Sequence, residues 1–355
     1  MCQKNEMTTD VFEQLAAALD RLPNGFPRTP SGVEILILKR IFSPEEAALA
    51  GQLSGAPETL DEISARLSLP AGEARKALFK LARRGMVWLD TQGKKPRFRL
   101  APFVVGFLEE QWELMDHELA HLVEAYLAGG GAAGIMKPQP ALNRVVPAQR
   151  AVKTEWVLPY DDVRTLLLSA RSFQVRDCIC RRQQDQLGGR KCDFPLQVCL
   201  YFSERESGGV SGTISQEEAL ALLARTEEVG LVHTVSNVMK GVGFVCNCCG
   251  CCCGILRGIT DWGIENSVAH ANYFAVIDPE TCTDCGDCIR RCQVNAVSAG
   301  DGIAMVDRAR CIGCGLCVTG CPSNAARLER KPEAEIIHPP EDYAAWERER
   351  RNNRQ

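Results

Sequence analysis

Cysteine is the residue type that dominates the chemistry of this sequence. The chain has 355 residues and 19 cysteines, and eighteen of these lie between Cys178 and Cys321. The remaining one, Cys2, is interpreted as a free, exposed thiol. The sequence has no export signal and no run of roughly 18 apolar residues, so we expect a cytoplasmic protein without a membrane span. Because thiols stay reduced in the cytoplasm, so many cysteines indicate ligands for metal ions or clusters and not disulfides.

Eight of the cysteines form two runs with the same spacing, C-x2-C-x2-C-x3-C. The first run ends at Cys292, and the second ends at Cys321 and is followed by Pro322. The runs begin 29 residues apart, and CTDCGDCIRRCQVNA aligns with CIGCGLCVTGCPSNA, which indicates an internal duplication. On these motifs, residues 273–329 resemble the bacterial two-cluster ferredoxins.

This resemblance implies two [4Fe–4S] clusters with crossed ligation. Three cysteines of a run wrap around one cluster, while the fourth points away and completes the other cluster. The expected ligand sets are Cys282, Cys285, Cys288 and Cys321 for one cluster, and Cys311, Cys314, Cys317 and Cys292 for the other. Gly286, Gly313 and Gly315 would let backbone amides approach the sulfurs, and Gln293 replaces the usual proline without loss of a ligand. Two zinc sites are the alternative, but zinc motifs pair separated C-x2-C units.

Ten further cysteines precede the ferredoxin segment, and their spacing matches no motif that fixes a ligand set. They are Cys178, Cys180, Cys192, Cys199, Cys246, Cys248, Cys249, Cys251, Cys252 and Cys253. The favoured interpretation is one or two further iron–sulfur clusters, which could pass electrons onward; zinc and redox-active thiols are the alternatives. His233 is a conceivable nitrogen ligand, although a core histidine is the favoured interpretation.

Local geometry suggests how these ten cysteines pair. In an extended chain, residues two apart point to the same face, so Cys178 and Cys180 are expected to share a site, as are Cys246 and Cys248. Cys249, Cys251 and Cys253 would form a same-face set on the same argument. Glycines at 250 and 254 permit tight turns instead, which leaves the partition of this run open.

The front half of the chain has the helix-start and hairpin signals that predict a winged helix-turn-helix. Capping boxes at Ser43–Glu46 and Thr59–Glu62 begin two helices, and a third helix is predicted over 72–84. Residues 86–89 and 95–100 read as a hairpin, which would be the wing. Between Arg75 and Arg99 there are nine Lys or Arg and one acidic residue, a local charge of +8 in a chain with a net charge of −4.

That local charge suits phosphate contacts on DNA, although the overall charge excludes a uniformly basic nucleic-acid coat. The candidate DNA-binding residues are Arg75, Lys76, Lys80, Arg83, Arg84, Lys94, Lys95, Arg97 and Arg99. A winged helix used for docking or dimerisation, with a solvated basic face, is the alternative. The expected partners are therefore a redox protein, DNA, or a second copy of the chain in a homodimer.

A long helix over 103–127 and a flexible Gly-rich linker over 129–134 are predicted to close the front half. His117 and His121 are i, i+4 partners on that helix, and a surface or packed pair is favoured over a metal site because no third ligand is evident. The charged tail after Lys331 is expected to be a short exposed helix or disorder.

The expected fold is α+β and multidomain. The domains are an N-terminal helix (1–30), a winged helix-turn-helix (31–105), the long helix and linker (106–135), a cysteine-rich α+β domain (136–272), a dicluster ferredoxin domain (273–330) and the charged tail (331–355). A winged helix before a dicluster ferredoxin also resembles the architecture of a group of 4Fe–4S proteins of anaerobes.

Three functions fit these features. The first is an electron-transfer protein that exchanges electrons with a partner oxidoreductase, since clusters carry electrons without a catalytic side chain. The second is a redox-sensing transcription regulator that binds DNA through the winged helix. The third is a reductase with a catalytic cysteine-rich cluster site. No nicotinamide or flavin site is expected, because GGGAAG follows a helix and not a strand.

Overall fold

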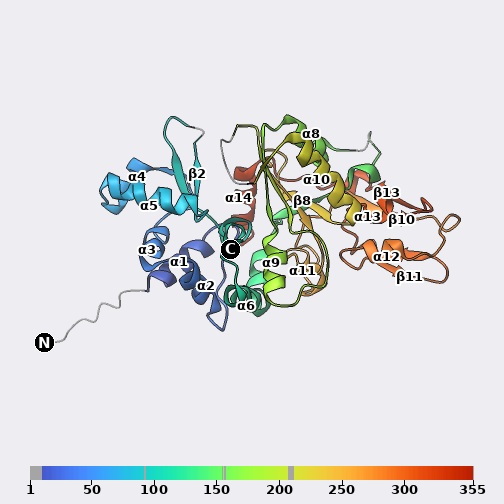
Figure 1. Ribbon diagram of the computed structural model, residues 1–355, viewed down its shortest axis with the longest axis horizontal. Helices are drawn as coiled ribbons and strands as arrows, with labels where there is room; N and C mark the ends of the chain where they lie inside the picture. Colours follow the sequence, from blue (N-terminus) through green and yellow to red (C-terminus); the bar gives the residue numbers. More distant parts are fainter. Residues whose placement is uncertain (1–9, 92, 154, 156, 207–211, 355) are drawn as a thin grey trace. The chain divides into compact units, whose positions relative to one another are not determined.

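The computed structural model describes residues 10–91, 93–153, 155, 157–206 and 212–354, so Cys2 lies outside the described residues. The chain divides into two compact units, residues 1–135 and 136–355 (Figure 1). Helices combine with antiparallel sheets, which confirms the coarse α+β prediction. No helix in the described ranges is both long and apolar enough to cross a membrane.

The first unit is mainly helical. Its helices are α1 (Val11–Asp20), α2 (Val33–Ile41), α3 (Pro44–Ala50), α4 (Leu60–Leu67), α5 (Ala71–Arg83) and α6 (His117–Tyr126), with α7 (Ala132–Met136) at the boundary between the units. Three short strands form one antiparallel sheet in the order β1-β3-β2, and they are β1 (Glu58–Thr59), β2 (Val87–Asp90) and β3 (Arg97–Leu100).

Side-chain caps explain where two of these helices begin. The Ser43 hydroxyl accepts the Glu46 N–H while the Glu46 carboxylate accepts the Ser43 N–H, and Thr59 and Glu62 repeat the pattern. Each box satisfies two donors that the first helical turn leaves without a partner. Both predicted capping boxes are thus confirmed. The third predicted helix is present as α5, and β2 and β3 form the predicted hairpin.

The predicted long helix over 103–127 is wrong. An irregular turn at Phe103–Phe107, whose backbone is not helical at Val104 to Gly106, a 3-10 turn at Glu109–Gln111 and helix α6 replace it. The Glu109 carboxylate accepts the Gly106 N–H, and the Asp116 carboxylate accepts the Leu119 N–H and caps α6. Such side chains offer the backbone an alternative to continuous helix, which explains the breaks.

The stretch 129–134, predicted to be a flexible linker, contains a turn with a positive φ at Gly130, and helix α7 begins at Ala132. A Cβ on Gly131 would approach the Tyr126 ring to 2.7 Å, and one on Gly134 would approach Pro27 to 2.4 Å. Gly131 and Gly134 therefore permit close packing.

The second unit is built on a six-stranded antiparallel sheet with the order β4-β8-β9-β6-β5-β7. Its strands are β4 (Asn143–Val146), β5 (Ser172–Asp177), β6 (Gln197–Ser203), β7 (Thr213–Ile214), β8 (Val232–Ser236) and β9 (Phe244–Cys248). The accompanying helices are α8 (Val163–Ser169), α9 (Ile179–Gln186), α10 (Gln216–Val229) and α11 (Arg257–Thr260).

At the centre of this sheet, one face packs against helix α10 and the opposite face carries cysteines. On β9, Val245 and Asn247 point to one side, and Asn247 accepts a hydrogen bond from Thr226 of α10. Cys246 and Cys248 alternate with them and point to the opposite side. Helix α10 therefore covers the face that carries no cysteine of β9.

The ferredoxin segment adds two small sheets and two short helices to this unit. β10 (Tyr273–Ile277) pairs with β13 (Ala326–Arg330), and β11 (Val297–Ala299) pairs with β12 (Ala304–Val306). The helices are α12 (Asp287–Arg291) and α13 (Leu316–Thr319). A hydrogen bond from the Ala148 N–H to the Cys314 carbonyl, 2.8 Å long, ties the segment to the chain after β4.

The C-terminal segment ends in the short helix α14 (Tyr343–Asn352), as predicted, and half of its residues are exposed, but two are buried. These two are Trp346 and Arg350, and the Arg350 side chain is 0% exposed. The Arg350 guanidinium donates to the carbonyls of Pro138 and Pro140, and the Trp346 indole donates to the Ala141 carbonyl at 2.9 Å. The tail therefore packs against residues 138–141 at the start of the second unit, about 210 residues earlier in the sequence.

We predict that Arg350→Ala destabilises the second unit by about 1–3 kcal/mol, because it leaves two half-buried carbonyls without their charged donor and removes a buried side chain. Chemical unfolding of the anaerobically purified full chain measures this free energy. Arg348→Ala on the same helix is the matched control, since Arg348 is exposed. Equal unfolding free energies for the two variants would contradict a structural role for the tail.

Candidate iron–sulfur and metal centre

The duplication in the ferredoxin segment extends to the backbone. Three pairs of residues 29 positions apart share a positive φ: Asp284 and Gly313, Gly286 and Gly315, and Asn295 and Asn324. A Cβ on Gly313 would lie 2.4 Å from the Tyr273 carbonyl oxygen, so glycine is required there. The two runs therefore fold as equivalent loops, each followed by a short helix.

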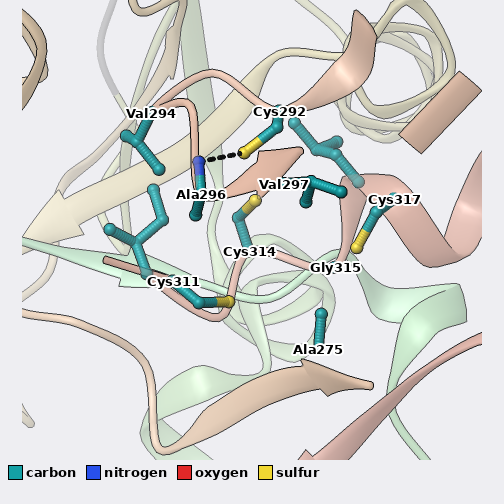
Figure 2. A pocket seen from close by; sticks show the side chains of 11 residues that line it. Ala275, Cys292, Val294, Ala296, Val297, Cys311, Cys314, Gly315 and Cys317 are labelled. Carbon is teal, nitrogen blue, oxygen red and sulfur yellow. Dashed lines mark hydrogen bonds between the residues drawn. The ribbon is translucent and has the colours of Figure 1, made fainter. Parts of the chain in front are cut away.

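Each loop lines a cavity together with one cysteine from the other run. The residues that line the first cavity include Cys282, Cys285, Cys288 and Cys321. Those that line the second include Cys311, Cys314, Cys317 and Cys292. Figure 2 shows the sulfurs of the second set turned toward a common space. The structure thus brings the eight cysteines together in the two crossed sets that the resemblance implies.

The surroundings of the second cavity suit a buried cluster. The Ala296 N–H donates to the Cys292 sulfur at 3.1 Å, the kind of contact that stabilises a thiolate (Figure 2). Burial raises the pKa of the Cys314 thiol, and it raises that of Cys317 to about 12. These thiols would therefore lose their protons only when a cationic metal centre is bound.

The first cavity lies closer to the surface. Cys285 is exposed, whereas Cys314 and Cys317 of the second cavity are half-buried and buried. At Cys321 burial raises the pKa, but the Ser323 hydroxyl and the N–H groups of 326, 325 and 323 outweigh it and lower the pKa overall. A thiolate is thus stabilised by hydrogen bonds at this more accessible cavity.

The middle cysteines separate into two groups. Six sulfurs interact in a closed ring, each with two neighbours, and we call this set the six-thiol ring: Cys178, Cys180, Cys253, Cys248, Cys246 and Cys199. The other four, the four-thiol group, lie within 4.8 Å of one another: Cys192, Cys249, Cys251 and Cys252. All cysteines in the described ranges are free thiols.

Three elements position the six-thiol ring. Cys246 and Cys248 alternate along β9 and join the same ring, as their spacing predicts, and Cys199 lies on the neighbouring strand β6. Cys178 and Cys180 also share this ring, but the extended stretch predicted for them is wrong. Cys178 is the N-cap of α9 and Cys180 lies in its first turn, because the Arg182 N–H bonds to the Cys178 carbonyl.

The same-face set predicted for Cys249, Cys251 and Cys253 is wrong. The chain turns after β9, and the Cys253 N–H bonds to the Cys249 carbonyl at 3.1 Å. This turn sends Cys253 to the six-thiol ring and leaves Cys252 beside Cys249 and Cys251. Cys192 reaches the group from the loop after α9, which is held by a hydrogen bond from Arg190 to the Cys192 carbonyl.

A buried arginine lies between the two groups. Arg181 is 0% exposed, and its guanidinium donates to the carbonyls of Pro195 and Asn247. In the part of the chain that the structure describes, no carboxylate forms an ion pair with it. Burial lowers the pKa of Arg181, but the negative charge of Cys178, Cys249 and Cys248 outweighs burial and raises it.

Two thiols near Arg181 have lowered pKa values. Hydrogen bonds from Cys246 and Cys253 lower the pKa of Cys248 to about 6. Hydrogen bonds from Cys251 and Cys252, with Arg181 adding to them, lower the pKa of Cys249 to about 2. Thiolate is the form that binds metal, so Cys248 and Cys249 have the charge that ligation requires. Their neighbours in both groups, such as Cys246 and Cys252, have raised pKa values and would lose their protons only on binding a metal centre. Sequence reasoning missed Arg181, although its place directly after Cys180 was a signal.

Gln293 connects the middle cysteines to the ferredoxin segment. Its side-chain oxygen accepts the Gly250 N–H, and its amide donates to the Gly230 carbonyl, both at 3.0 Å. Gly250 lies between two cysteines of the four-thiol group, and Gln293 directly follows Cys292. A Cβ on Gly250 would lie 1.8 Å from the Gln293 carbonyl oxygen, so the two segments pack as closely as the backbone allows.

The histidines do not join these groups. His233 is buried on the face that α10 covers, and its Nδ1 lies 2.6 Å from the Asn247 side-chain oxygen. Burial lowers its pKa, which fits the favoured interpretation of a core histidine. In the first unit, the Nε2 atoms of His117 and His121 lie 3.2 Å apart on α6. No third ligand joins this exposed pair among the described residues.

Several of the candidate DNA-binding residues have partners inside the first unit. Arg84 and Lys80 contact the Glu46 carboxylate at 2.5 and 3.0 Å, and Lys95 contacts Asp61. At Glu46 burial raises the pKa, but Arg84, the Ser43 N–H and Lys80 together lower it to about 2. Arg84 is thus bound to a buried carboxylate and supports the fold.

The other candidates divide into stacked and exposed side chains. Arg75 and Arg99 lie over the rings of Phe79 and Trp88. The Arg97 guanidinium donates to the Pro57 carbonyl. Lys76, Arg83 and Lys94 are exposed, as are Arg75, Lys80, Lys95 and Arg97 despite their contacts.

The comparisons with known proteins agree with the ferredoxin geometry. Residues 275–328 match the family model of the 4Fe-4S dicluster domain. No curated protein sequence matches the chain. The matched segment and the gathered cysteines indicate an iron–sulfur electron-transfer protein.

We predict that Arg181→Met removes bound metal from the middle cysteines and spares the ferredoxin clusters, because it leaves several buried thiolates without a counter-charge. Iron, sulfide and zinc per chain after anaerobic purification measure this loss. Arg182→Met makes the same change at the next residue, whose guanidinium pairs with Asp177, and should keep the full metal content. Full metal content in Arg181→Met would contradict this role.

Proposed function

We propose that the chain is an electron-transfer protein that holds two [4Fe–4S] clusters by crossed ligation and passes electrons to or from a partner oxidoreductase in the cytoplasm. The observation that carries the proposal is the lining of the two cavities. Each has three cysteines from one run and the fourth from the other, as two-cluster ferredoxins require. When bound, the clusters supply one-electron redox chemistry; the protein supplies thiolates, N–H donors and burial.

We further propose that the six-thiol ring holds an additional iron–sulfur cluster. Five of its sulfurs come from a helix N-terminus and two strands and the sixth, that of Cys253, from the turn after β9; Cys178, Cys248 and Cys253 are buried. The positive charge of Arg181 offsets the negative charge that a thiolate-bound cluster carries.

The exposure of the cavities suggests a direction for the electrons. The cavity with Cys311, Cys314, Cys317 and Cys292 is the inner one, because Gln293 ties Cys292 to the middle cysteines. The cavity containing the exposed Cys285 is the outer one. We infer that electrons move between the middle centre and the inner cluster, and between the outer cluster and the partner.

We predict that Cys321→Ser damages the cluster built on Cys282, Cys285 and Cys288, because the Cys321 sulfur lines that cavity. EPR spectra of the reduced variants should match those of Cys288→Ser. Cys314→Ser is the matched control and should affect the other cluster. Spectra of Cys321→Ser that match Cys314→Ser would contradict crossed ligation.

A second candidate function, a redox-sensing transcription regulator, is favoured by the first unit. Helices α2 to α5 followed by the β2–β3 hairpin have the element order of a winged helix. Lys76 and Arg83 are exposed and seven residues apart on α5, so they lie on one face, and the exposed Lys94 lies in the hairpin. We infer that this surface would contact phosphates if the unit binds DNA.

If the regulator function holds, Arg83→Glu and Lys76→Glu should each weaken DNA binding and flatten its salt dependence by about one unit of slope. Gel shifts at several salt concentrations measure both effects. Arg21→Glu, an equal charge change at an exposed residue of α1's C-cap, is the control. Arg84 is avoided, because its replacement would break the contact with Glu46. Equal binding by all three variants would contradict the regulator function.

A further inference from the structure

The sulfurs of the four-thiol group lie closer together than the sulfurs of either set of ferredoxin cysteines. The Cys192 sulfur lies 3.9 Å from that of Cys249 and 3.7 Å from that of Cys252, and the sulfurs of Cys251 and Cys252 are 3.6 Å apart. Among the described residues this is the one set of metal-ligating atoms that all lie within 4.8 Å of one another. Neither set of ferredoxin cysteines is so compact.

These distances fit a single metal ion. Metal–sulfur bonds of about 2.3 Å at tetrahedral angles place neighbouring sulfurs about 3.8 Å apart. A cubane needs a wider cage, because four irons and four sulfides lie between its thiolates. Four cysteines around one tetrahedral ion is the ligand set of closed structural zinc sites.

The surroundings of the group complete such a site. Four thiolates around Zn²⁺ leave a net charge of about −2, and the buried Arg181 lies beside Cys249. Two backbone groups fix the ligand loops from outside: Arg190 donates to the Cys192 carbonyl at 2.7 Å, and the Gly250 N–H donates to Gln293.

We propose that Cys192, Cys249, Cys251 and Cys252 bind one zinc ion as a closed structural site, distinct from any iron–sulfur cluster. The ion joins the loop after α9 to the turn after β9. That turn also carries Cys253 into the six-thiol ring and Gly250 to Gln293, so the zinc site holds the middle cysteines in place beside the ferredoxin segment. This goes beyond the electron-transfer function and does not depend on it.

The test is metal analysis of the full chain purified anaerobically, with zinc, iron and sulfide measured together. We expect about one zinc per chain, lost in Cys192→Ser and Cys252→Ser, while the EPR signals of the ferredoxin clusters remain. Cys199→Ser, in the six-thiol ring, is the matched control and should keep the zinc. Cys192→His should retain zinc, because histidine is also a zinc ligand, which separates loss of a ligand from loss of the fold.

Growth with Co²⁺ in place of zinc gives a second readout. Tetrahedral cobalt bound to thiolates should add visible absorption bands that Cys252→Ser removes and Cys199→Ser keeps. Zinc retained in both Cys192→Ser and Cys252→Ser would overturn the proposal. So would a loss of iron and sulfide in equal amounts from these variants with no zinc in the parent protein, since that result would identify a cluster. Failure of the electron-transfer proposal would instead appear as missing ferredoxin signals in the parent.

Discussion

The buried guanidinium of Arg181 sets the constraint on which the middle of the molecule depends. A charge removed from water costs several kcal/mol unless opposite charge and hydrogen bonds surround it. Here two carbonyls satisfy part of its donor set, and thiolates from both cysteine groups supply the negative charge. The arginine and the thiolates therefore stabilise one another, and the metal binding that we propose would deprotonate the remaining buried thiols.

This constraint extends through the sheet to the ferredoxin segment. The Asn247 carbonyl accepts from Arg181, while its side chain bonds to Thr226 and His233 on the opposite face, so the strand that carries Cys246 and Cys248 is fixed from both sides. The turn after that strand contacts Gln293, beside Cys292. These hydrogen bonds, joined by the chain from Asn247 to Gly250, thus connect the middle cysteines to the inner ferredoxin cavity.

Much of the ferredoxin segment could be predicted from the sequence, because its ligands are local. The spacing within each run dictates a loop around one cavity, and the duplication implies that the fourth cysteines cross. The capping boxes at Ser43 and Thr59 are equally local, since a cap involves residues three apart.

The middle cysteines could not be assigned in this way, because tertiary contacts decide their direction. Cys178 and Cys180 have the spacing of a strand pair, yet they begin a helix, and a turn separates Cys252 from Cys253. The tail shows the same limit: its charges suggest a solvated helix, but Arg350 is buried against carbonyls some 210 residues away in sequence. Gln293 is only an unusual residue after a cysteine until its contact with Gly250 is seen.

The most direct test of the account is iron and acid-labile sulfide per chain in anaerobically reconstituted full-length protein, combined with EPR during reductive titration. The account predicts about twelve irons with equal sulfide, from two ferredoxin clusters that interact magnetically and a third that titrates separately. A fully reconstituted sample with fewer than about six irons would contradict the two crossed clusters on which the proposed function rests.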